Sequence, residues 1–354
     1  MSKDTKKDPR DFGVTNPSES PTDTVQAIKV CPTSQDIIAC GGWDETFRIY
    51  KLGNRTLNQA FSKHVESPIL DLAWNSAAMC YMALGNGVIA VFNAQDQSIK
   101  PFAKHEGVIC IACIQLGTTE LVLTLGVNKQ LLFWSSNNGV GNQAFTVPLE
   151  KVPNSMEVDL VSNIVLIGVG ANLGLYFLQK LQSNDNSVNY VQIVLDSPIS
   201  CVRMRDRAES ELATFNSKIR KIIASGTDGR VYVGELNLDT LKCNNLIVFK
   251  AHQSKDSLFS VNAIGFSKVT CYSLYTAGSD GNLIFWDLHK KGKLSSYQTS
   301  DNYPITACDL APNQKFLVFA TGYDWAIGVW GTGQFGKQRP GLFVHEMVQG
   351  DHKV

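Results

Sequence analysis

Residues 249–294 read FKAHQSKDSLFSVNAIGFSKVTCYSLYTAGSDGNLIFWDLHKKGKL, and this stretch decides the fold. His252 is followed by an apolar run at Val261–Phe266 and by a second run that reaches Thr276. A Gly-Ser-Asp-Gly segment at 278–281 then leads into a third apolar run that ends in Trp-Asp. Glycine and aspartate supply the backbone freedom of a tight turn, while aromatic and β-branched residues favour strands. The stretch therefore predicts antiparallel strands joined by short turns.

The turn aspartate of this stretch recurs along the chain. An acidic or amide residue stands at the equivalent position of seven turns: Asp44, Asn86, Asn128, Asn172, Asp228, Asp280 and Asp324. The intervals between them are 42, 42, 44, 56, 52 and 44 residues, and glycine stands two positions earlier in six of the seven. Repeats of about 40–45 residues are typical of propeller blades, each of them a four-stranded sheet. The longer intervals indicate insertions, one of them a polar surface loop at Arg205–Lys218.

The predicted strands are apolar along almost their whole length, as in NIVLIGVG at 163–170 and KFLVFATG at 315–322. A sheet with one face in water would alternate polar and apolar residues, whereas a blade between two neighbours is covered on both faces. We therefore predict an all-β fold, a seven-bladed β-propeller. The order of His, turn acid and Trp-Asp resembles the WD repeat, so the expected architecture is a seven-bladed WD-repeat β-propeller.

The WD resemblance implies a structural tetrad in the blade quoted above. In WD blades an imidazole, a turn carboxylate, a strand hydroxyl and a tryptophan indole form a buried chain of hydrogen bonds. Here the four residues would be His252, Asp280, Thr276 and Trp286. A polar-capped hairpin over a core tryptophan is the alternative interpretation of the same residues.

Composition excludes several classes of protein. The formal net charge is zero, so no global field attracts nucleic acid or an anionic membrane. No run of 18 apolar residues is present, and the first twelve residues lack the apolar core of a signal peptide. Nine cysteines, several of them in apolar runs, favour reduced thiols in the cytosol or nucleus. We expect no membrane span.

Three regions are predicted from these patterns. Residues 1–23 form a mostly disordered polar arm, 24–348 a single seven-bladed propeller and 349–354 a tail. Part of the arm, Asp11–Thr15, is a candidate fourth strand for the last blade. The repeat assigns 24–57 to the first blade, so that the run after residue 57 is placed in the second.

The third strand of the last blade has two possible locations. The simple repeat places it at Ala326–Trp330. Alternatively, Ala326–Pro340 is an inserted loop and Leu342–Glu346 is the strand. The family resemblance described below favours the second location.

No motif predicts an enzyme, a cofactor or a metal site. Gly331-Thr-Gly333-Gln-Phe-Gly336 spells a dinucleotide fingerprint, but such a motif needs a strand before it and a helix after it, and Gln338-Arg339-Pro340 leaves no room for the helix. Cys110 and Cys113 have the spacing of a metal pair, yet in a strand residues three apart point to opposite faces. No nucleophile–base constellation is evident, so we predict a non-enzymatic protein without cofactor.

The region 220–325 is more similar to two sister families than to a generic WD repeat. The runs GTDGRVYVGEL, VFKAHQSKDSLFSVNAIGF and LYTAGSDGNLIFWDLHKKGKL are similar to the WD-repeat mRNA-export factor of the nuclear pore and to the WD-repeat mitotic checkpoint protein. The run NYPITACDLAPNQKFLVFATGYDW favours the export factor, because the checkpoint protein usually lacks the Trp of Tyr323-Asp324-Trp325. Blades two and three depart from the family's usual turns.

The resemblance implies a propeller that binds a short acidic peptide. In the export factor that peptide is the GLEBS segment of an FG nucleoporin, which carries adjacent glutamates. Arg230 and Lys250 match the family's basic pair for those carboxylates, and Trp43 fits both families at the first blade. An Arg offers a planar fork to a carboxylate and a Lys a point charge.

The resemblance also implies a second groove, for RNA or for an acidic peptide. It comprises Phe249, Trp286, Asp287, Lys291 and Lys293, where the family has an Arg in place of Lys291. An aromatic wall with nearby lysines suits both kinds of ligand. Trp286 has a structural role in the blade as well.

The predicted function is docking of an FG nucleoporin at the nuclear pore in support of mRNA export. The predicted partners are that nucleoporin and RNA or ribonucleoprotein, with the chain as a monomer in a heteromeric complex. The predicted location is the nucleus, at the pore and envelope, with a cytoplasmic pool. The alternatives are a checkpoint role with a mitotic kinase as partner, and a generic WD-repeat scaffold.

Overall fold

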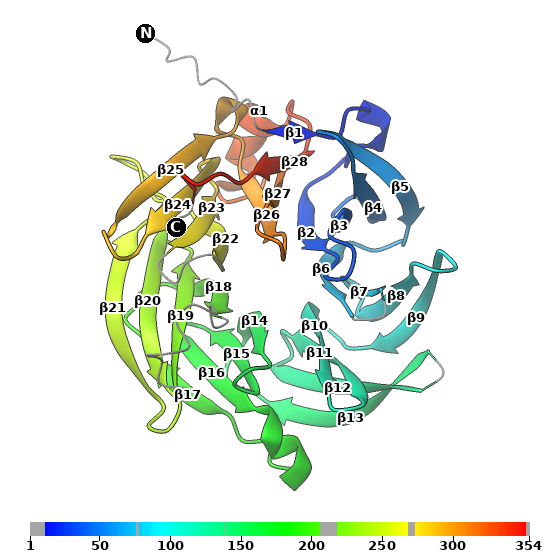
Figure 1. The fold of residues 1–354 in the computed structure, drawn as a ribbon, viewed down its shortest axis with the longest axis vertical. Helices are drawn as coiled ribbons and strands as arrows, with labels where there is room; N and C mark the ends of the chain where they lie inside the picture. Colours follow the sequence, from blue (N-terminus) through cyan, green and yellow to red (C-terminus); the bar gives the residue numbers. More distant parts are fainter. Residues whose placement is uncertain (1–10, 76–77, 138, 206–217, 268–272, 352–354) are drawn as a thin grey trace. The chain divides into compact units, whose positions relative to one another are not determined.

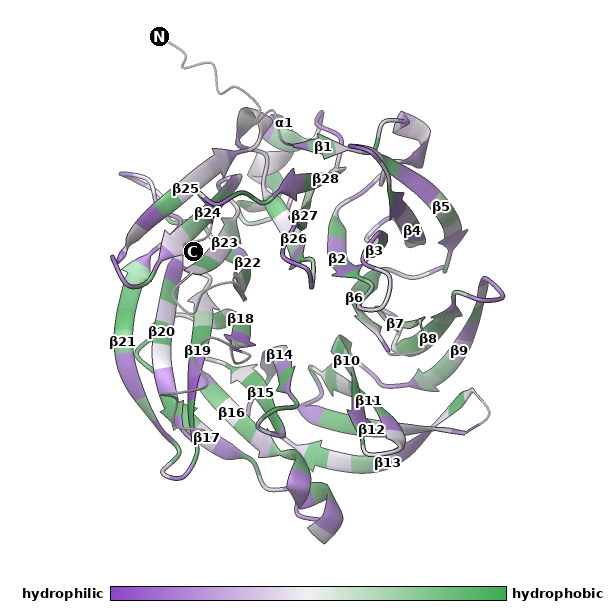
Figure 2. Cartoon of the chain, viewed as in Figure 1, coloured by the Kyte–Doolittle hydropathy of each residue, from purple (hydrophilic) through white to green (hydrophobic). Residues whose placement is uncertain are grey.

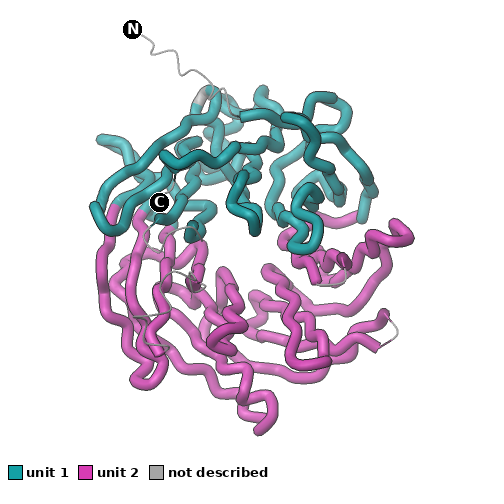
Figure 3. Tube along the Cα trace, in the orientation of Figure 1, with its two compact units in different colours: residues 1–65, 227–229, 250–354 teal, residues 66–226, 230–249 magenta. Residues whose placement is uncertain are grey.

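The computed structural model describes residues 11–75, 78–137, 139–205, 218–267 and 273–351. Their strands form seven four-stranded sheets, so the fold is an all-β seven-bladed β-propeller, as predicted from the sequence (Figure 1). Neighbouring strands pair antiparallel. The chain divides into two compact units, one of residues 1–65, 227–229 and 250–354 and the other of residues 66–226 and 230–249 (Figure 3).

Blades two to five lie in the second unit, apart from the last residue of β21. Blade two contains β6 (Ile69–Trp74), β7 (Met79–Leu84), β8 (Val88–Asn93) and β9 (Ser98–Lys104). Blade three contains β10 (Val108–Leu116), β11 (Thr119–Gly126), β12 (Gln130–Asn137) and β13 (Val140–Pro148). Blade four contains β14 (Pro153–Asp159), β15 (Ile164–Val169), β16 (Asn172–Phe177) and β17 (Asn189–Gln192). Blade five contains β18 (Ile199–Met204), β19 (Ile219–Gly226), β20 (Arg230–Asn237) and β21 (Lys242–Lys250).

Blades six, seven and one lie in the first unit. Blade six contains β22 (Val261–Phe266), β23 (Ser273–Gly278), β24 (Asn282–Asp287) and β25 (Gly292–Gln298). Blade seven contains β26 (Ile305–Leu310), β27 (Phe316–Thr321), β28 (Gly341–Glu346) and, from the start of the chain, β1 (Phe12–Gly13). Blade one contains β2 (Val25–Val30), β3 (Ile37–Gly42), β4 (Thr46–Leu52) and β5 (Leu57–His64).

Helices are short throughout the described residues. The α-helix is α1 (Thr332–Phe335), and the 3₁₀ turns are η1 (Pro17–Glu19), η2 (Leu178–Ser183), η4 (Ser300–Asn302) and η5 (Gly328–Gly331). None of the helices in this part of the chain has the length and hydrophobicity that crossing a bilayer would need. The predicted loop at Arg205–Lys218 falls, at residues 206–217, outside the described residues.

Burial explains why the middle strands were easy to predict and the fourth strands were not. All six residues of β15 and of β23 are buried, which matches the unbroken apolar sequence of β15 and the mainly apolar sequence of β23 (Figure 2). The fourth strand of blade one, β5, is buried only at its first residue and alternates or is exposed after that. Such a strand buries few side chains, so its sequence carries little hydrophobic signal.

The prediction that the run after residue 57 starts blade two is wrong. Leu57–His64 is β5, the fourth strand of blade one, and Leu57 pairs with Leu52 across a short hairpin. A second correction concerns blade four, where Asn172 is the first residue of β16 instead of a turn residue. The turn is shorter there because Gly170 takes a positive φ of 61°, which a glycine adopts freely.

The two possible locations of the last blade's third strand are resolved by the pairing of β28. Phe316 of β27 pairs with Glu346, and Thr321 pairs with Gly341. The strand therefore lies where the family resemblance placed it, and the segment before it contains η5 and α1. The predicted N-terminal arm contributes β1, in which Phe12 pairs with Val344 (Figure 1). Residues 1–10 lie outside the described part of the chain.

A buried histidine joins both ends of the described chain to blades six and seven. His345 on β28 bonds through Nδ1 to Oδ1 of Asp11 at 2.8 Å and through Nε2 to Oδ2 of Asp351 at 3.2 Å. The side chains of His345 and Asp351 are both fully buried. Ser295 and Tyr297 of β25 donate their hydroxyls to Asp351, at 2.7 and 2.6 Å. We call these five residues the terminal clasp.

Candidate functional site

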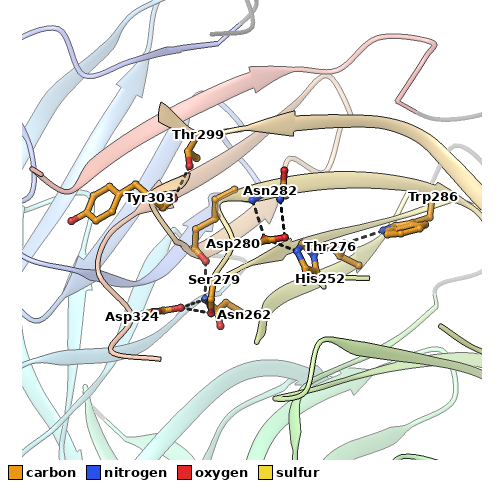
Figure 4. Close-up of polar contacts among 11 residues, drawn as sticks. His252, Asn262, Thr276, Ser279, Asp280, Asn282, Trp286, Thr299, Tyr303 and Asp324 are labelled. Atoms are coloured by element: carbon orange, nitrogen blue, oxygen red, sulfur yellow. Dashed lines mark hydrogen bonds and ion pairs between the residues drawn. The ribbon is translucent and has the colours of Figure 1, made fainter. Parts of the chain in front are cut away.

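Blade six contains the hydrogen-bond chain that the WD resemblance implied. His252 Nδ1 donates to Asp280 Oδ1 at 2.8 Å, and His252 Nε2 accepts from Thr276 Oγ1 at 2.8 Å (Figure 4). The same hydroxyl oxygen accepts from Trp286 Nε1 at 2.9 Å. Burial opposes the charge of Asp280, but its hydrogen bonds from His252 and Asn282 hold the pKa of that carboxyl below its usual value. The carboxylate thereby orients the imidazole that completes the chain.

Blade three contains a second tetrad, which the sequence analysis missed. His105 donates through Nε2 to Asn128 Oδ1 at 3.1 Å and accepts through Nδ1 from Thr124 Oγ1 at 2.8 Å. Trp134 Nε1 donates to the Thr124 hydroxyl at 2.8 Å. Burial lowers the pKa of His105, although the bond to Asn128 opposes this shift. The signal was present, because His, Thr, turn amide and Trp have the same order and nearly the same spacing as in blade six.

The turn aspartate of blade one, Asp44, forms an ion pair instead of a hydrogen bond to a histidine. Asp44 pairs with Arg48 at 2.7 Å, and both side chains are buried. The strand position of Thr276 is occupied here by Cys40, and that of Trp286 by Tyr50. Burial raises the pKa of the Cys40 thiol to about 12, so it remains protonated and apolar. A buried ion pair thus replaces the histidine-centred tetrad in this blade.

Of the predicted acidic-peptide site, Arg230 stands at the start of β20. Its Nη1 forms an ion pair with Oδ2 of Asp196 at 2.8 Å. The Arg230 side chain is 34% exposed and that of Asp196 is 84% exposed. The guanidinium is therefore accessible, and a carboxylate of the protein itself already binds it.

The other two predicted residues of that site lie in the first unit. Lys250 is exposed at the end of β21. Trp43 lies in the turn of blade one, where its backbone N–H donates to Thr24 O at 2.9 Å. Its side chain is 52% exposed, so the indole is a free apolar surface on a fixed turn. Arg230 belongs to the second unit.

Several residues of the second predicted groove also make structural contacts. Lys293 Nζ lies 5.4 Å from the centre of the Trp286 ring, within the range of a cation–π contact. Asp287 is buried, and its Oδ1 accepts from the backbone N–H groups of His289 and of the following lysine. Lys291 is exposed in the turn that follows, with a φ of 53°. Phe249 is half-buried in the second unit.

Blades six and seven are joined by Asp324, a contact that the sequence analysis did not identify. Its Oδ2 accepts from Asn262 Nδ2 at 2.8 Å and from Ser279 Oγ at 2.5 Å (Figure 4). Its Oδ1 accepts from the N–H of Ala326 at 3.1 Å. The aspartate of the Tyr-Asp-Trp ending thus fixes the turn of one blade to its neighbour, and Trp325 beside it is 60% exposed.

The described residues contain no cluster of three or more His, Cys, Asp or Glu side chains that could hold a metal ion. Cys110 and Cys113 point to different neighbours, because Cys110 Sγ contacts Asn154 O at 4.0 Å and Cys113 Sγ contacts Ala73 O at 3.9 Å. The two thiols thus face different neighbouring strands, as expected for residues three apart in a strand. The Gly331–Gly336 segment contains the single-turn helix α1, which the sequence analysis did not expect, but no strand precedes it.

Comparison with known proteins agrees with this geometry. Residues 243–287 match the WD40 family, described as WD domain, G-beta repeat. The mRNA export factor rae-1 of Caenorhabditis elegans is 26% identical over 345 residues, covering 93% of this chain and 87% of its own length. The chain is a WD40-repeat protein homologous to mRNA export factors. The resemblance noted at 220–325 thus extends over most of the sequence.

Other relatives are also similar over most of the chain, and a solved structure has the same fold. Protein Rae1 of Drosophila melanogaster is 26% identical over 328 residues, covering 90% of this WD40 protein and 89% of its own length. The mitotic checkpoint protein bub3 of Dictyostelium discoideum is 22% identical over 324 residues, with 87% and 88% coverage. The structure of U3-55K superimposes with a TM-score of 0.72 at 12% identity, covering 96% of this chain and 99% of that one, which supports the fold alone.

Proposed function

We propose that this chain is a non-enzymatic WD40 protein that binds a GLEBS-type segment of an FG nucleoporin and supports export of mRNA from the nucleus. The proposal rests on similarity over about nine-tenths of the chain to mRNA export factors. It places the protein in the nucleus, at the pore and envelope with a cytoplasmic pool, as a monomer in a heteromeric complex. No cofactor takes part.

The proposed binding chemistry is recognition of adjacent glutamates. The half-exposed guanidinium of Arg230 can hold one carboxylate through two parallel N–H donors. Lys250 adds an exposed ammonium for a second carboxylate. The exposed indole of Trp43 gives an aromatic anchor of the kind that dominates interface energies. Charge sets the specificity, and the buried aromatic area gives most of the affinity.

The direct test is binding of a synthetic GLEBS segment to the purified full chain, measured by calorimetry. The matched control is the same segment with its adjacent glutamates changed to glutamines. We expect saturable binding that the glutamine version loses. Equal affinity for both segments, or none for either, contradicts the proposal.

The mitotic checkpoint role is the second candidate, because the relatives include the checkpoint protein bub3 of Dictyostelium discoideum. Localisation of the tagged chain through the cell cycle separates the two roles. Staining of the nuclear rim supports the export role, and staining of kinetochores supports the checkpoint role. Purification without any nucleoporin or checkpoint kinase among the partners favours a generic scaffold.

The second groove is proposed as a contact for RNA or an acidic peptide through Lys291 and Lys293. Each exposed lysine that neutralises a phosphate adds to the dependence of binding on salt. We expect Lys291→Glu with Lys293→Glu to weaken binding of a single-stranded RNA and to reduce the slope of log K against log salt. Unchanged affinity and slope would contradict the proposal that RNA binds in this groove.

A further inference from the structure

A cavity of about 290 Å³ lies in the first unit, where blades six and seven meet the segment before β28. Its apolar lining includes Leu283 and Ile305, both buried, together with Phe319 and Phe343. The two phenylalanine rings are stacked, with centroids 5.4 Å apart and planes inclined by 25°. Small-molecule pockets begin at about 300 Å³ and are lined mainly by apolar and aromatic groups. The cavity is therefore suited to one flat ring.

A hydroxyl also lines this cavity. Thr321 is 5% exposed, and among the described residues its side chain has no hydrogen-bond partner. Its hydroxyl is therefore open to the cavity, where it can donate a hydrogen bond to a ligand carboxylate.

The cavity also contains a cation that no residue neutralises. Arg339 lines the cavity and is exposed, and it makes no hydrogen bond or ion pair with any described residue. Asp11, the acid of the lining, is already bonded to His345. Arg339 is the one lysine or arginine in the described lining, so the site suits a single negative charge rather than a dianion such as phosphate.

Strand register sets the distance between the stacked rings and the Thr321 hydroxyl. Phe319 pairs with Phe343, and Thr321 pairs with Gly341. Side chains two residues apart on a strand share a face and are about 7 Å apart. Arg339 precedes β28 and lines the same cavity as Thr321.

We propose that this cavity binds an arylpropionate-like ligand, with its ring against Phe319 and Phe343 and its carboxylate between Thr321 and Arg339. A two-carbon link between ring and carboxylate matches the spacing of two residues along a strand. The same chemistry occurs in a free small acid and in the C-terminal aromatic residue of a peptide. This site is separate from the residues assigned to the nucleoporin.

The test uses 3-(4-fluorophenyl)propionate as probe and the full chain as receptor, with binding followed by fluorine NMR. We expect saturable binding that Arg339→Gln weakens about tenfold, as loss of a charge-assisted hydrogen bond predicts. Thr321→Val is expected to weaken binding several-fold without lowering stability, because the hydroxyl it removes has no partner in the protein. The amide of the probe should bind at least tenfold more weakly than the acid.

Lys337→Gln is the matched control, because it removes an exposed charge two residues from Arg339 that does not line the cavity. Its affinity for the probe should equal that of the wild type. The peptide Gly-Gly-Phe, with a free or an amidated C-terminus, identifies the source of the ligand. If the peptide with a free C-terminus binds more tightly than the probe, the ligand is a peptide terminus. If it binds more weakly than the probe, the ligand is a small acid. If neither the probe nor the free peptide shows binding that depends on Arg339, the proposal is wrong.

Discussion

At the scale of single residues, the pair of Arg230 and Asp196 controls access to the proposed peptide site. An ion pair this exposed contributes only about 0–1 kcal/mol to stability. A carboxylate from a partner can therefore replace Asp196 at little cost. We predict that Asp196→Asn strengthens binding of the acidic GLEBS segment about two- to fivefold, because the carboxylate of Asp196 no longer competes for the guanidinium. Calorimetry with the wild-type segment measures the change.

The matched control for this prediction is Asp239→Asn, which breaks another exposed pair, with Lys218 at 2.6 Å. That variant should bind the segment as the wild type does. Weaker binding by Asp196→Asn would show instead that the aspartate orients Arg230 for its partner. An unchanged affinity would contradict the assignment of Arg230 to the site.

The hydroxyl of Thr276 has a different role, because it both donates and accepts within a buried chain. Thr276→Val keeps the shape but removes the hydrogen bonds of Thr276 with Trp286 Nε1 and His252 Nε2. Each buried hydrogen bond lost in this way costs about 1–3 kcal/mol, so we expect a loss of about 2–6 kcal/mol of unfolding free energy. Urea denaturation measures it. Thr240→Val, in an exposed turn, should change stability by less than about 0.5 kcal/mol.

At the scale of elements, the terminal clasp makes blade seven sensitive to pH. Burial opposes the charge of His345, but hydrogen bonds from its ring to Asp11 and Asp351 outweigh burial and raise its pKa. A raised folded-state pKa gives stabilisation that is complete below the unfolded value of about 6.5 and is lost as the pH rises through the folded value. The pKa of Asp351 is depressed, so its contribution is lost only in strong acid.

We therefore predict that urea stability falls as the pH is raised above about 6.5, and that His345→Gln flattens this dependence while lowering stability at the acidic end. Asp11→Asn should weaken the effect because it removes one of the two carboxylates. His64→Gln is the control, since His64 forms an exposed pair with Glu45. A pH profile of His345→Gln parallel to that of the wild type would contradict a charged clasp.

The elements also show what a sequence can and cannot reveal. Middle strands such as β15 and β23 are buried at every residue, so their positions follow from hydrophobic runs and turn residues. The fourth strand β5 lacks such a run and was placed in the wrong blade. The bond of His345 to Asp11 joins residues 334 positions apart, and no local pattern predicts that pairing. The tetrad of blade three was predictable but was obscured because an amide takes the place of the carboxylate.

At the scale of the whole molecule, seven sheets of the same construction carry different side chains at equivalent turns. The tetrads of blades three and six are hydrogen-bonded chains through a buried histidine, whereas blade one contains a buried ion pair. Such interior groups stabilise each blade and leave the exposed turns free to vary. Function is therefore expected in the residues that the repeat does not use, such as Arg230, Lys250 and Trp43.

Charge reversal of both proposed basic residues tests this separation of scaffold and site. Neither Arg230 nor Lys250 is buried, so Arg230→Glu with Lys250→Glu should leave the unfolding free energy within about 1 kcal/mol of the wild type. Like charges facing the glutamates of the partner repel them, and we expect binding of the GLEBS segment to be abolished. Lys151→Glu with Lys242→Glu makes the same change in net charge at exposed positions elsewhere and should bind normally. Loss of binding in both double variants would mean that net charge alone attracts the segment, and retention of binding in the first would place the peptide on another surface.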